Sequence, residues 1–230
     1  MLHVIDKVNC NFLKALTLNL SISIKHKTFF SLALEHEALL FGDFRLKSGT
    51  KSSYFFNVAS FLSGGAIYEL ASFYTDIIIE NNLQFDSIFG PAYKGIPLAA
   101  AVSSILYQRT NRRVPLTFDR KEVKDYGEGG AIVGASLSGE ILIIDDVLTA
   151  GTALSNSIKL VKEGGGVVTG AIVGLDREER VDGVLVREII EKKSNFLIYS
   201  IAGVSDLLSY LASEKKYSKE AVILSESIKA

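Results

Sequence analysis

Residues 141–153 read Ile-Leu-Ile-Ile-Asp-Asp-Val-Leu-Thr-Ala-Gly-Thr-Ala, and this stretch decides the fold. Four consecutive apolar residues are typical of a strand that is buried on both faces of a sheet. The small residues after Leu148 are typical of a turn, and the pattern over 153–163 predicts a helix. A buried strand that leads into a helix indicates a βαβ unit, and βαβ units build parallel sheets.

The same alternation of apolar runs and helical patterns extends over most of the chain. Four further apolar runs predict strands, and two further patterns predict helices. The strands are expected at 86–90, 114–118, 167–175 and 195–201, and the helices at about 66–81 and 97–107. The sequence therefore predicts an α/β fold, with a parallel sheet covered by helices on both faces. Ligands of such sheets bind beyond the carboxyl ends of the strands, so site residues are sought just after each apolar run.

The N-terminal part of the chain has a weaker pattern. Residues 1–27 show little periodicity and mixed polarity, and they precede an amphipathic segment at 30–40 and an aromatic, strand-like run at 53–58. We interpret 1–27 as an extension of unknown role. Residues 28–230 are expected to form one domain, a size that a single hydrophobic core can serve.

The composition excludes several classes of protein. The net charge of -1 excludes general affinity for nucleic acid, so phosphates must be bound by local clusters and backbone amides. Cys10 is the single cysteine, which excludes an internal disulfide and a cysteine-rich metal site. No apolar run is long enough to cross a bilayer, and the N-terminus lacks a secretory pattern. We expect a soluble protein of the reducing cytoplasm, with no membrane or nucleic-acid partner.

Two carboxylates, Asp145 and Asp146, follow the decisive strand. The backbone N-H groups that begin the next helix have no helical partners, and with the helix dipole they attract anions. Thr149 and Thr152 add hydroxyl donors, and Gly151 lets a phosphate approach the backbone. Adjacent carboxylates beside an anion site suit a ribose 5-phosphate, whose hydroxyls donate to them and whose C1 becomes positive during reaction. The alternative is a strand that ends in two solvated aspartates before an ordinary helix.

Two other segments supply cations. Residues 90–97 read Gly-Pro-Ala-Tyr-Lys-Gly-Ile-Pro and follow an apolar run, so Tyr93 and Lys94 are placed to meet a pyrophosphate. A Pro/Gly turn with a surface lysine is the alternative. Residues 120–130 combine three cations with three glycines, which predicts a mobile lid whose lysines neutralise a departing pyrophosphate. Because three acidic residues offset these cations, a solvated hairpin is the alternative there.

The arrangement of four apolar residues, Asp-Asp, two residues and Thr-Ala-Gly-Thr resembles the phosphoribosyl pyrophosphate signature of type I phosphoribosyltransferases. Three more segments resemble the orotate phosphoribosyltransferases among them. Residues 120–130 are similar to their catalytic loop, 46–57 to their Leu-Lys-Ser-Gly and Tyr-Phe-Phe segment, and 175–180 to their orotate-binding turn. The resemblance begins at about Phe30 and is firmest over 47–180. It implies the type I phosphoribosyltransferase fold, with a small N-terminal hood subdomain.

The resemblance implies an enzyme of pyrimidine (UMP) biosynthesis. Such an enzyme transfers the 5-phosphoribosyl group from phosphoribosyl pyrophosphate to orotate, giving orotidine 5'-phosphate and pyrophosphate. Mg2+ is implied as cofactor, held mainly by substrate and water oxygens with no direct protein ligand expected. A homodimer is also implied, in which the Arg120–Gly130 loop reaches the neighbouring subunit's site.

The resemblance also assigns roles to individual residues. Those expected to act in catalysis are Lys94, Lys124, Asp145 and Asp146. Those expected to bind phosphoribosyl pyrophosphate are Lys47, Tyr93, Lys94, Arg120, Lys121, Lys124, Tyr126, Asp145, Asp146, Val147, Leu148, Thr149, Ala150, Gly151, Thr152 and Ala153. Those expected to contact orotate are Phe55, Phe56, Thr149 and Arg177. Tyr126 departs from the family, which commonly has histidine there, so a phenol that cannot carry positive charge takes that place.

Physical reasoning favours orotate among the possible bases. Orotate carries a carboxylate that uracil lacks, and Arg177 follows an apolar run as a suitable bidentate partner for it. Adjacent strand residues point to opposite faces, so at most one of the Phe55 and Phe56 rings faces the base.

Three alternative functions stay open. The first is a phosphoribosyltransferase for another base. The second is a regulator that binds phosphoribosyl pyrophosphate without catalysis, and the third is a generic doubly wound nucleotide-binding module. The lysines of 120–130 argue against the regulator, and the module would need a Gly-x-Gly-x-x-Gly turn that the chain lacks.

Overall fold

A six-stranded sheet forms the centre of the protein in the computed structural model, which describes residues 22–45, 49, 51–124 and 130–228 except for the side chains at 123 and 124. The strand order is β10-β7-β6-β3-β4-β5, and every neighbouring pair is parallel except β4 and β5. The strands are β3 (Ser87–Phe89), β4 (Leu116–Lys124), β5 (Gly130–Gly134), β6 (Gly139–Leu148), β7 (Gly166–Asp176) and β10 (Leu197–Gly203). Each predicted apolar run overlaps one of these strands, so the parallel sheet is confirmed.

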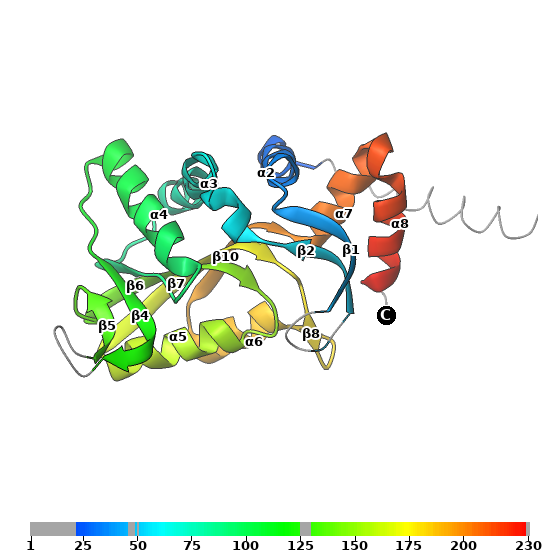
Figure 1. The fold of residues 1–230 in the computed structure, drawn as a ribbon. Helices are drawn as coiled ribbons and strands as arrows, with labels where there is room; N and C mark the ends of the chain where they lie inside the picture. The colour runs from blue at the N-terminus through cyan, green and yellow to red at the C-terminus, as the bar shows by residue number, and fades with distance from the viewer. Residues whose placement is uncertain (1–21, 46–48, 50, 125–129, 229–230) are drawn as a thin grey trace, which may run out of the picture.

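Helices cover both faces of this sheet, as predicted (Figure 1). Alternate residues of β6 show why: Leu142 and Ile144 pack into an apolar core on one face, whereas Ile141 and Ile143 pack into a second core on the other. The first face carries α2 (Ile24–Glu35), α3 (Ala66–Glu80), α4 (Gly95–Thr110) and α7 (Val204–Ser213), and the second carries α5 (Thr152–Glu163) and α6 (Val186–Ser194). A short hairpin of β8 (Arg180–Val181) and β9 (Val184–Leu185) precedes α6.

A second, antiparallel hairpin forms the predicted hood beside the central sheet. It consists of β1 (Leu39–Arg45) and β2 (Lys51–Phe56), and it is followed by the 3-10 helix η1 (Val58–Leu62). Helix α8 (Ser218–Ser227), which follows the short η2 (Lys215–Tyr217), packs against β2 (Figure 1). The hood therefore combines elements from both ends of the described chain, a contribution that the sequence pattern did not indicate.

The segment at 30–40, expected to be one amphipathic element, contains two elements. Helix α2 ends at Glu35, Glu37 takes a positive φ of 52°, and β1 begins directly after this turn. A left-handed residue commonly ends a helix, which explains the break. Helix α2 also begins inside the 1–27 segment, while residues 1–21 lie outside the described part of the chain, so a separate extension stays a prediction.

The segment at 120–130, predicted to be a lid, contributes to two antiparallel strands. Strand β4 continues to Lys124, and β5 begins at Gly130, which pairs with it. These arms have the hairpin arrangement that the sequence offered as the alternative. Residues 125–129 lie outside the described residues, so the lid stays a prediction.

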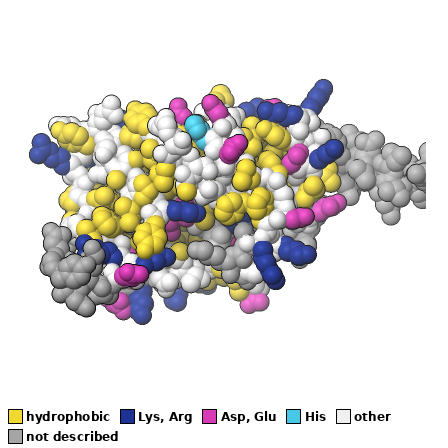
Figure 2. Space-filling view, in the orientation of Figure 1, with side chains coloured by type: hydrophobic (Ala, Val, Ile, Leu, Met, Phe, Trp, Pro, Cys, Tyr) yellow, Lys and Arg dark blue, Asp and Glu magenta, His cyan; other side chains and the backbone are white. Residues whose placement is uncertain are grey.

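The described surface is mixed in charge. On the face shown in Figure 2, lysine and arginine side chains are interspersed with aspartate and glutamate. Within the described ranges, no helix is both long and apolar enough to cross a membrane.

Candidate active site

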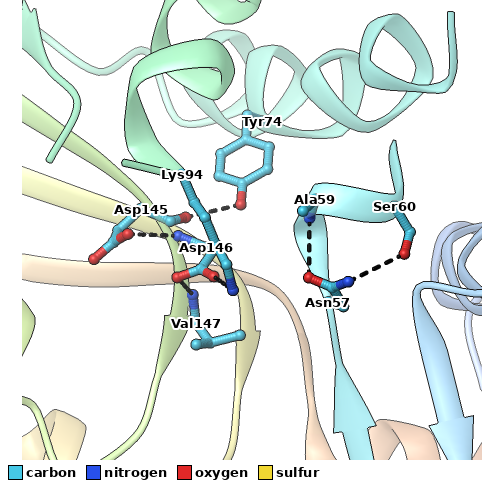
Figure 3. A network of polar contacts seen from close by, with 8 residues as sticks. All are labelled: Asn57, Ala59, Ser60, Tyr74, Lys94, Asp145, Asp146 and Val147. Atoms are coloured by element: carbon cyan, nitrogen blue, oxygen red, sulfur yellow. Dashed lines mark hydrogen bonds and ion pairs between the residues drawn. The ribbon is translucent and has the colours of Figure 1, made fainter. Parts of the chain in front are cut away.

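The acidic pair lies at the carboxyl end of β6. Asp145 is 7% exposed and Asp146 is 8% exposed. Backbone N-H groups hold both carboxylates: that of Asp146 donates to Asp145 Oδ1 at 2.8 Å, and that of Val147 donates to Asp146 Oδ1 at 2.9 Å. From α3, the Tyr74 hydroxyl donates to the backbone carbonyl of Asp145 at 2.9 Å (Figure 3). The pair is therefore held in place before any ligand binds.

Lys94 gives the acidic pair a counter-charge. Its Nζ atom lies 2.8 Å from Asp146 Oδ2, and its side chain is 41% exposed (Figure 3). Burial and the neighbouring charge of Asp146 raise the pKa of Asp145 to about 8. At neutral pH the two carboxyl groups therefore favour a single negative charge, and Lys94 lies beside it.

Residues 149–151 form the turn between β6 and α5. Gly151 has a φ of 77°, a left-handed conformation that favours glycine. A Cβ atom at this position would lie 2.6 Å from Ile190 Cδ1 of α6, the end of a flexible side chain that would have to move aside. No side chain of the described chain caps the start of α5. The first N-H groups of the helix, which have no helical partners, are therefore available to a phosphate.

The turn between β3 and α4 brings cations to the same edge of the sheet. Asp119 of β4 holds its backbone, because Oδ1 accepts a hydrogen bond from the Ala92 N-H at 2.6 Å. The next residue, Tyr93, is exposed, and Lys121 Nζ lies 5.5 Å from the centre of its ring. Lys94 then lies directly before α4, and its side chain makes no hydrogen bond to the start of this helix. The two cation-bearing segments predicted from the sequence are therefore neighbours.

Arg177 follows β7 and lies between the phosphate turn and the hood. Its backbone N-H donates to the carbonyl of Leu148, the last residue of β6, at 2.9 Å. Its Nη2 atom donates to Ser52 Oγ at 3.0 Å, and its guanidinium carbon lies 4.3 Å from the centre of the Tyr54 ring. Its Nε atom lies 3.3 Å from a carboxylate oxygen of Glu179. The cation is thus fixed on the hood side of the acidic edge.

These groups form one site with three chemical parts. The amide turn suits a phosphate, the acidic pair suits hydroxyls or a carbon that becomes positive, and cations on both sides suit two further anionic groups. A phosphorylated sugar with an anionic leaving group and an anionic acceptor would engage all three.

Comparison with known proteins identifies the family to which this chain belongs. Residues 57–192 match the family described as the phosphoribosyl transferase domain. The orotate phosphoribosyltransferase of Legionella pneumophila (strain Lens) is 44% identical to this chain over 192 residues, which cover 83% of this chain and 90% of that protein. The chain belongs to the orotate phosphoribosyltransferase family. A family member from Escherichia coli O45:K1 (strain S88 / ExPEC) is 41% identical over 186 residues, 80% of this chain and 87% of that protein.

Solved structures agree with this membership. The orotate phosphoribosyltransferase of Francisella tularensis is 33% identical, with a TM-score of 0.73 over 87% of this chain and 98% of that chain. The UMP synthase of Leishmania donovani also has a TM-score of 0.73, over 88% of this chain and 42% of that chain, at 22% identity. The second likeness shows the shared fold alone.

The structure brings together most of the predicted family residues that it describes. Residues 145–153 run from the acidic pair through the phosphate turn into α5, and Arg120 and Lys121 lie on β4. Lys47 and Tyr126 lie outside the described residues, and the Lys124 side chain is also not described. The roles of these three residues stay predictions.

The two phenylalanines of β2 lie on opposite faces of the strand, as predicted. Phe56 is buried and packs against Phe29, with ring centroids 5.8 Å apart. Phe55 is half-buried and packs against Phe44 at 5.6 Å. Arg177 contacts the strand on the Phe56 side, so the Phe55 ring points away from this cation.

Four residues that hold the site were missed by the sequence reasoning: Ser52, Tyr54, Tyr74 and Asp119. Tyr74 and Asp119 carry no motif, because their contacts arise only when α3 packs on the sheet and β4 pairs with β3. Ser52 and Tyr54 did carry a signal. They lie two residues apart in a strand, which places both side chains on one face. This pattern would have predicted that they face the same neighbour, once the pairing of the strand was known.

Proposed function

We infer that the protein transfers the 5-phosphoribosyl group from phosphoribosyl pyrophosphate to orotate. The products are orotidine 5'-phosphate and pyrophosphate, and the reaction belongs to pyrimidine biosynthesis. One observation carries the inference: the Arg177 N-H donates to the Leu148 carbonyl at 2.9 Å, which sets the cation for the base directly beside the phosphate turn. Identity of 44% to an orotate phosphoribosyltransferase over most of the chain supports orotate as the base.

The sugar phosphate fits the edge of β6. We assign the 5-phosphate to the start of α5, where Gly151 leaves the backbone accessible and the Thr149 and Thr152 hydroxyls donate. The ribose hydroxyls donate to Asp145 and Asp146. As the reaction proceeds C1 becomes positive, and the negative charge of the acidic pair stabilises it.

Lys94 exchanges partners when the substrate binds. In the free chain it pairs with Asp146, and its exposure allows it to turn to the pyrophosphate once ribose hydroxyls engage the carboxylates. Arg120 and Lys121 approach from β4, and Lys124 lies at the end of the same strand. These cations offset the charge that develops on pyrophosphate as its bond to C1 breaks.

Orotate occupies the hood side of the site. Its carboxylate accepts hydrogen bonds from the Arg177 guanidinium, and Thr149 contacts it from the phosphate turn. Strand β2, with Phe55 and Phe56, borders this position. The N1 atom of orotate then forms the glycosidic bond to C1 from the side opposite to the pyrophosphate. The C1–O bond to pyrophosphate breaks, and the released pyrophosphate takes up the proton that N1 loses.

The acidic pair fits a Mg2+ ion that is held mainly by the substrate. Lys94 already pairs with one Asp146 oxygen, and the described residues contain no group of three or more His, Cys, Asp or Glu that could hold a metal. Mg2+ commonly uses one or two carboxylates, substrate phosphates and several waters, and this donor set suits that habit. When bound, the ion neutralises charge on the pyrophosphate.

A homodimer in which residues 120–130 complete the partner's site also forms part of the proposal. The arms of this hairpin lie at the β5 edge of the sheet, beyond which no further strand pairs among the described residues. Mixing a Lys124→Ala variant with an Asp146→Asn variant tests the sharing. Hybrid dimers should regain part of the activity, and no recovery counts against a shared loop.

A panel of acceptors tests the proposed base. The protein is incubated with phosphoribosyl pyrophosphate, Mg2+ and either orotate, uracil, hypoxanthine or adenine. We expect a kcat/KM for orotate at least about a hundredfold above the others, because only orotate satisfies the buried arginine. Faster transfer to another base would show that this base, and not orotate, is the substrate. Binding of phosphoribosyl pyrophosphate without transfer to any base would instead favour a regulator.

A further inference from the structure

We propose that Ser52 and Tyr54 are positioning residues that set the plane of the Arg177 guanidinium and thereby the preference of the site for a carboxylated base. The inference rests on the proposed function, in which Arg177 pairs with the orotate carboxylate. It adds the hood as the element that determines base specificity.

Ser52 and Tyr54 lie on the same buried face of β2. Side chains two residues apart in a strand point the same way, so both reach toward the end of β7. Ser52 Oγ lies 3.0 Å from Arg177 Nη2, and the Tyr54 ring centre lies 4.3 Å from the guanidinium carbon. The arginine side chain is only 11% exposed. Two positions of one strand therefore clamp one nearly buried cation.

The Ser52 hydroxyl can only accept a hydrogen bond from Arg177. This hydroxyl donates to the backbone carbonyl of Tyr54 at 2.6 Å, which uses its single proton. A lone pair of the same oxygen is left for Arg177, and a guanidinium can only donate. The hydrogen bond therefore has one possible direction, and it fixes one corner of the guanidinium.

The tyrosine fixes the orientation of the guanidinium plane. A ring centre 4.3 Å from the guanidinium carbon covers one of its two faces and attracts the positive charge. A ligand must then approach the N-H groups along the edge of the plane. Carboxylates bind guanidinium in this way, with two parallel hydrogen bonds.

The remaining contacts of the arginine decide which of its donors a ligand can reach. Nε is buried and forms an ion pair with the Glu179 carboxylate at 3.3 Å, and one N-H of Nη2 donates to Ser52. The N-H groups of Nη1 and the second N-H of Nη2 are left for a carboxylate that approaches the end of the guanidinium. Orotate supplies that acceptor, whereas uracil has no carboxylate to place there. By fixing the orientation of Arg177, Ser52 and Tyr54 thus make the site prefer orotate over uracil.

The test compares Tyr54→Leu with Tyr54→Phe by steady-state kinetics, with the KM for orotate and the KM for phosphoribosyl pyrophosphate measured separately. Leucine removes the aromatic face, so the orotate KM should rise about tenfold while the other KM stays within about twofold. Phenylalanine keeps the face and should restore most of the orotate affinity. Ser52→Ala should raise the orotate KM about fivefold, and Ser52→Thr, which keeps the hydroxyl, should raise it less.

Tyr217→Leu serves as the matched control. It makes the same change of tyrosine to leucine in η2, where the Tyr217 ring packs against Phe41 of the hood at 6.1 Å between ring centroids. The orotate KM of this variant should match that of the wild type. An equal rise of the orotate KM in Tyr217→Leu and Tyr54→Leu would show general loosening of the hood and would overturn the inference.

Two other outcomes also decide the matter. A Tyr54→Leu protein with an unchanged orotate KM, or with equal rises in both KM values, would overturn the inference. If this variant does not fold, Ser52→Ala decides by the same criterion. Failure of the wild-type chain to consume orotate at all would overturn the proposed function instead, so the two failures are distinguishable.

Discussion

The Nζ atom of Lys94 lies 2.8 Å from Oδ2 of Asp146, so the free site pairs a cation for the leaving group with its own acidic pair. The two residues come from different elements, the start of α4 and the end of β6. Neither charge is left unpaired before substrate arrives. A substrate that carries both hydroxyls and a pyrophosphate supplies a new partner for Asp146 and for Lys94 at the same time.

Replacement of Lys94 tests this exchange. Lys94→Met keeps the length of the side chain but removes the charge, so kcat should fall on the order of a hundred- to a thousandfold when the pyrophosphate departs without its cation. Steady-state kinetics at saturating substrates measures the loss. Lys159→Met is the matched control, because Lys159 pairs with Glu163 at 3.7 Å on the exposed surface of α5. Equal kcat values for the two variants would refute the role of Lys94.

The raised pKa of Asp145 predicts a dependence of stability on pH. Its ordinary value is 3.8, whereas in the folded chain it is about 8. Between these pH values the folded chain binds more protons than the unfolded chain at this residue, so its contribution to the free energy of unfolding falls as the pH rises from about 4 to about 8.

Asp145→Asn removes this titration. The Tm of the variant should therefore rise relative to that of the wild type between pH 5 and pH 8.5, with a difference on the order of a few kcal/mol in the free energy of unfolding. Thermal unfolding of both proteins across this range measures the effect. The carboxylates that lie away from residue 145 are common to both proteins and cancel, so the difference reports the acidic pair. A Tm difference that does not change with pH would contradict the raised pKa.

Gly151 is predicted to be essential to the phosphate turn. In Gly151→Ala the left-handed φ of 77° becomes strained within the phosphate turn itself, and the new Cβ must also displace Ile190 Cδ1, which lies 2.6 Å away, so the KM for phosphoribosyl pyrophosphate should rise by about tenfold or more. Gly183→Ala is the control, because Gly183 has a similar φ of 80° but open space around it. Both variants should lose about 1–2 kcal/mol of stability from the left-handed backbone. A normal KM in Gly151→Ala would contradict the assigned phosphate site.

Asp119 is predicted to hold the turn that carries Tyr93 and Lys94. Asp119→Ala leaves the Ala92 N-H without its acceptor, so the turn shifts and kcat should fall about tenfold. Asp119→Asn retains an oxygen in the same place and should restore most of the rate. Kinetics of the two variants side by side separates the loss of the hydrogen bond from the loss of the charge. A slow Asp119→Asn enzyme would show that the charge matters instead.

The parallel sheet could be predicted because each of its parallel strands is a short apolar run, buried on both faces. Strand β5 gave no such signal, since it is a short strand at the sheet edge bounded by Gly130 and Gly134. The packing of α8 against β2 was not predictable either, because it joins segments from opposite ends of the described chain. Periodicity describes one element at a time and does not reveal such long-range contacts.

The candidate site was predictable where its chemistry is contiguous in sequence. The acidic pair and the phosphate turn lie within 145–153, so one strand-to-helix junction reveals both. The residues that orient this chemistry were not predictable in the same way. Tyr74 reaches Asp145 from α3, and Asp119 reaches Ala92 from β4, so each depends on how separate elements pack.

The central claim is that the acidic pair, the amide turn and Arg177 hold phosphoribosyl pyrophosphate and orotate together at one edge of the sheet. The most direct measurement follows the absorbance of orotate after phosphoribosyl pyrophosphate and Mg2+ are added to the wild-type protein. The account predicts that orotate disappears with one pyrophosphate released for each orotidine 5'-phosphate formed. A protein that binds phosphoribosyl pyrophosphate but leaves orotate unconsumed would contradict it.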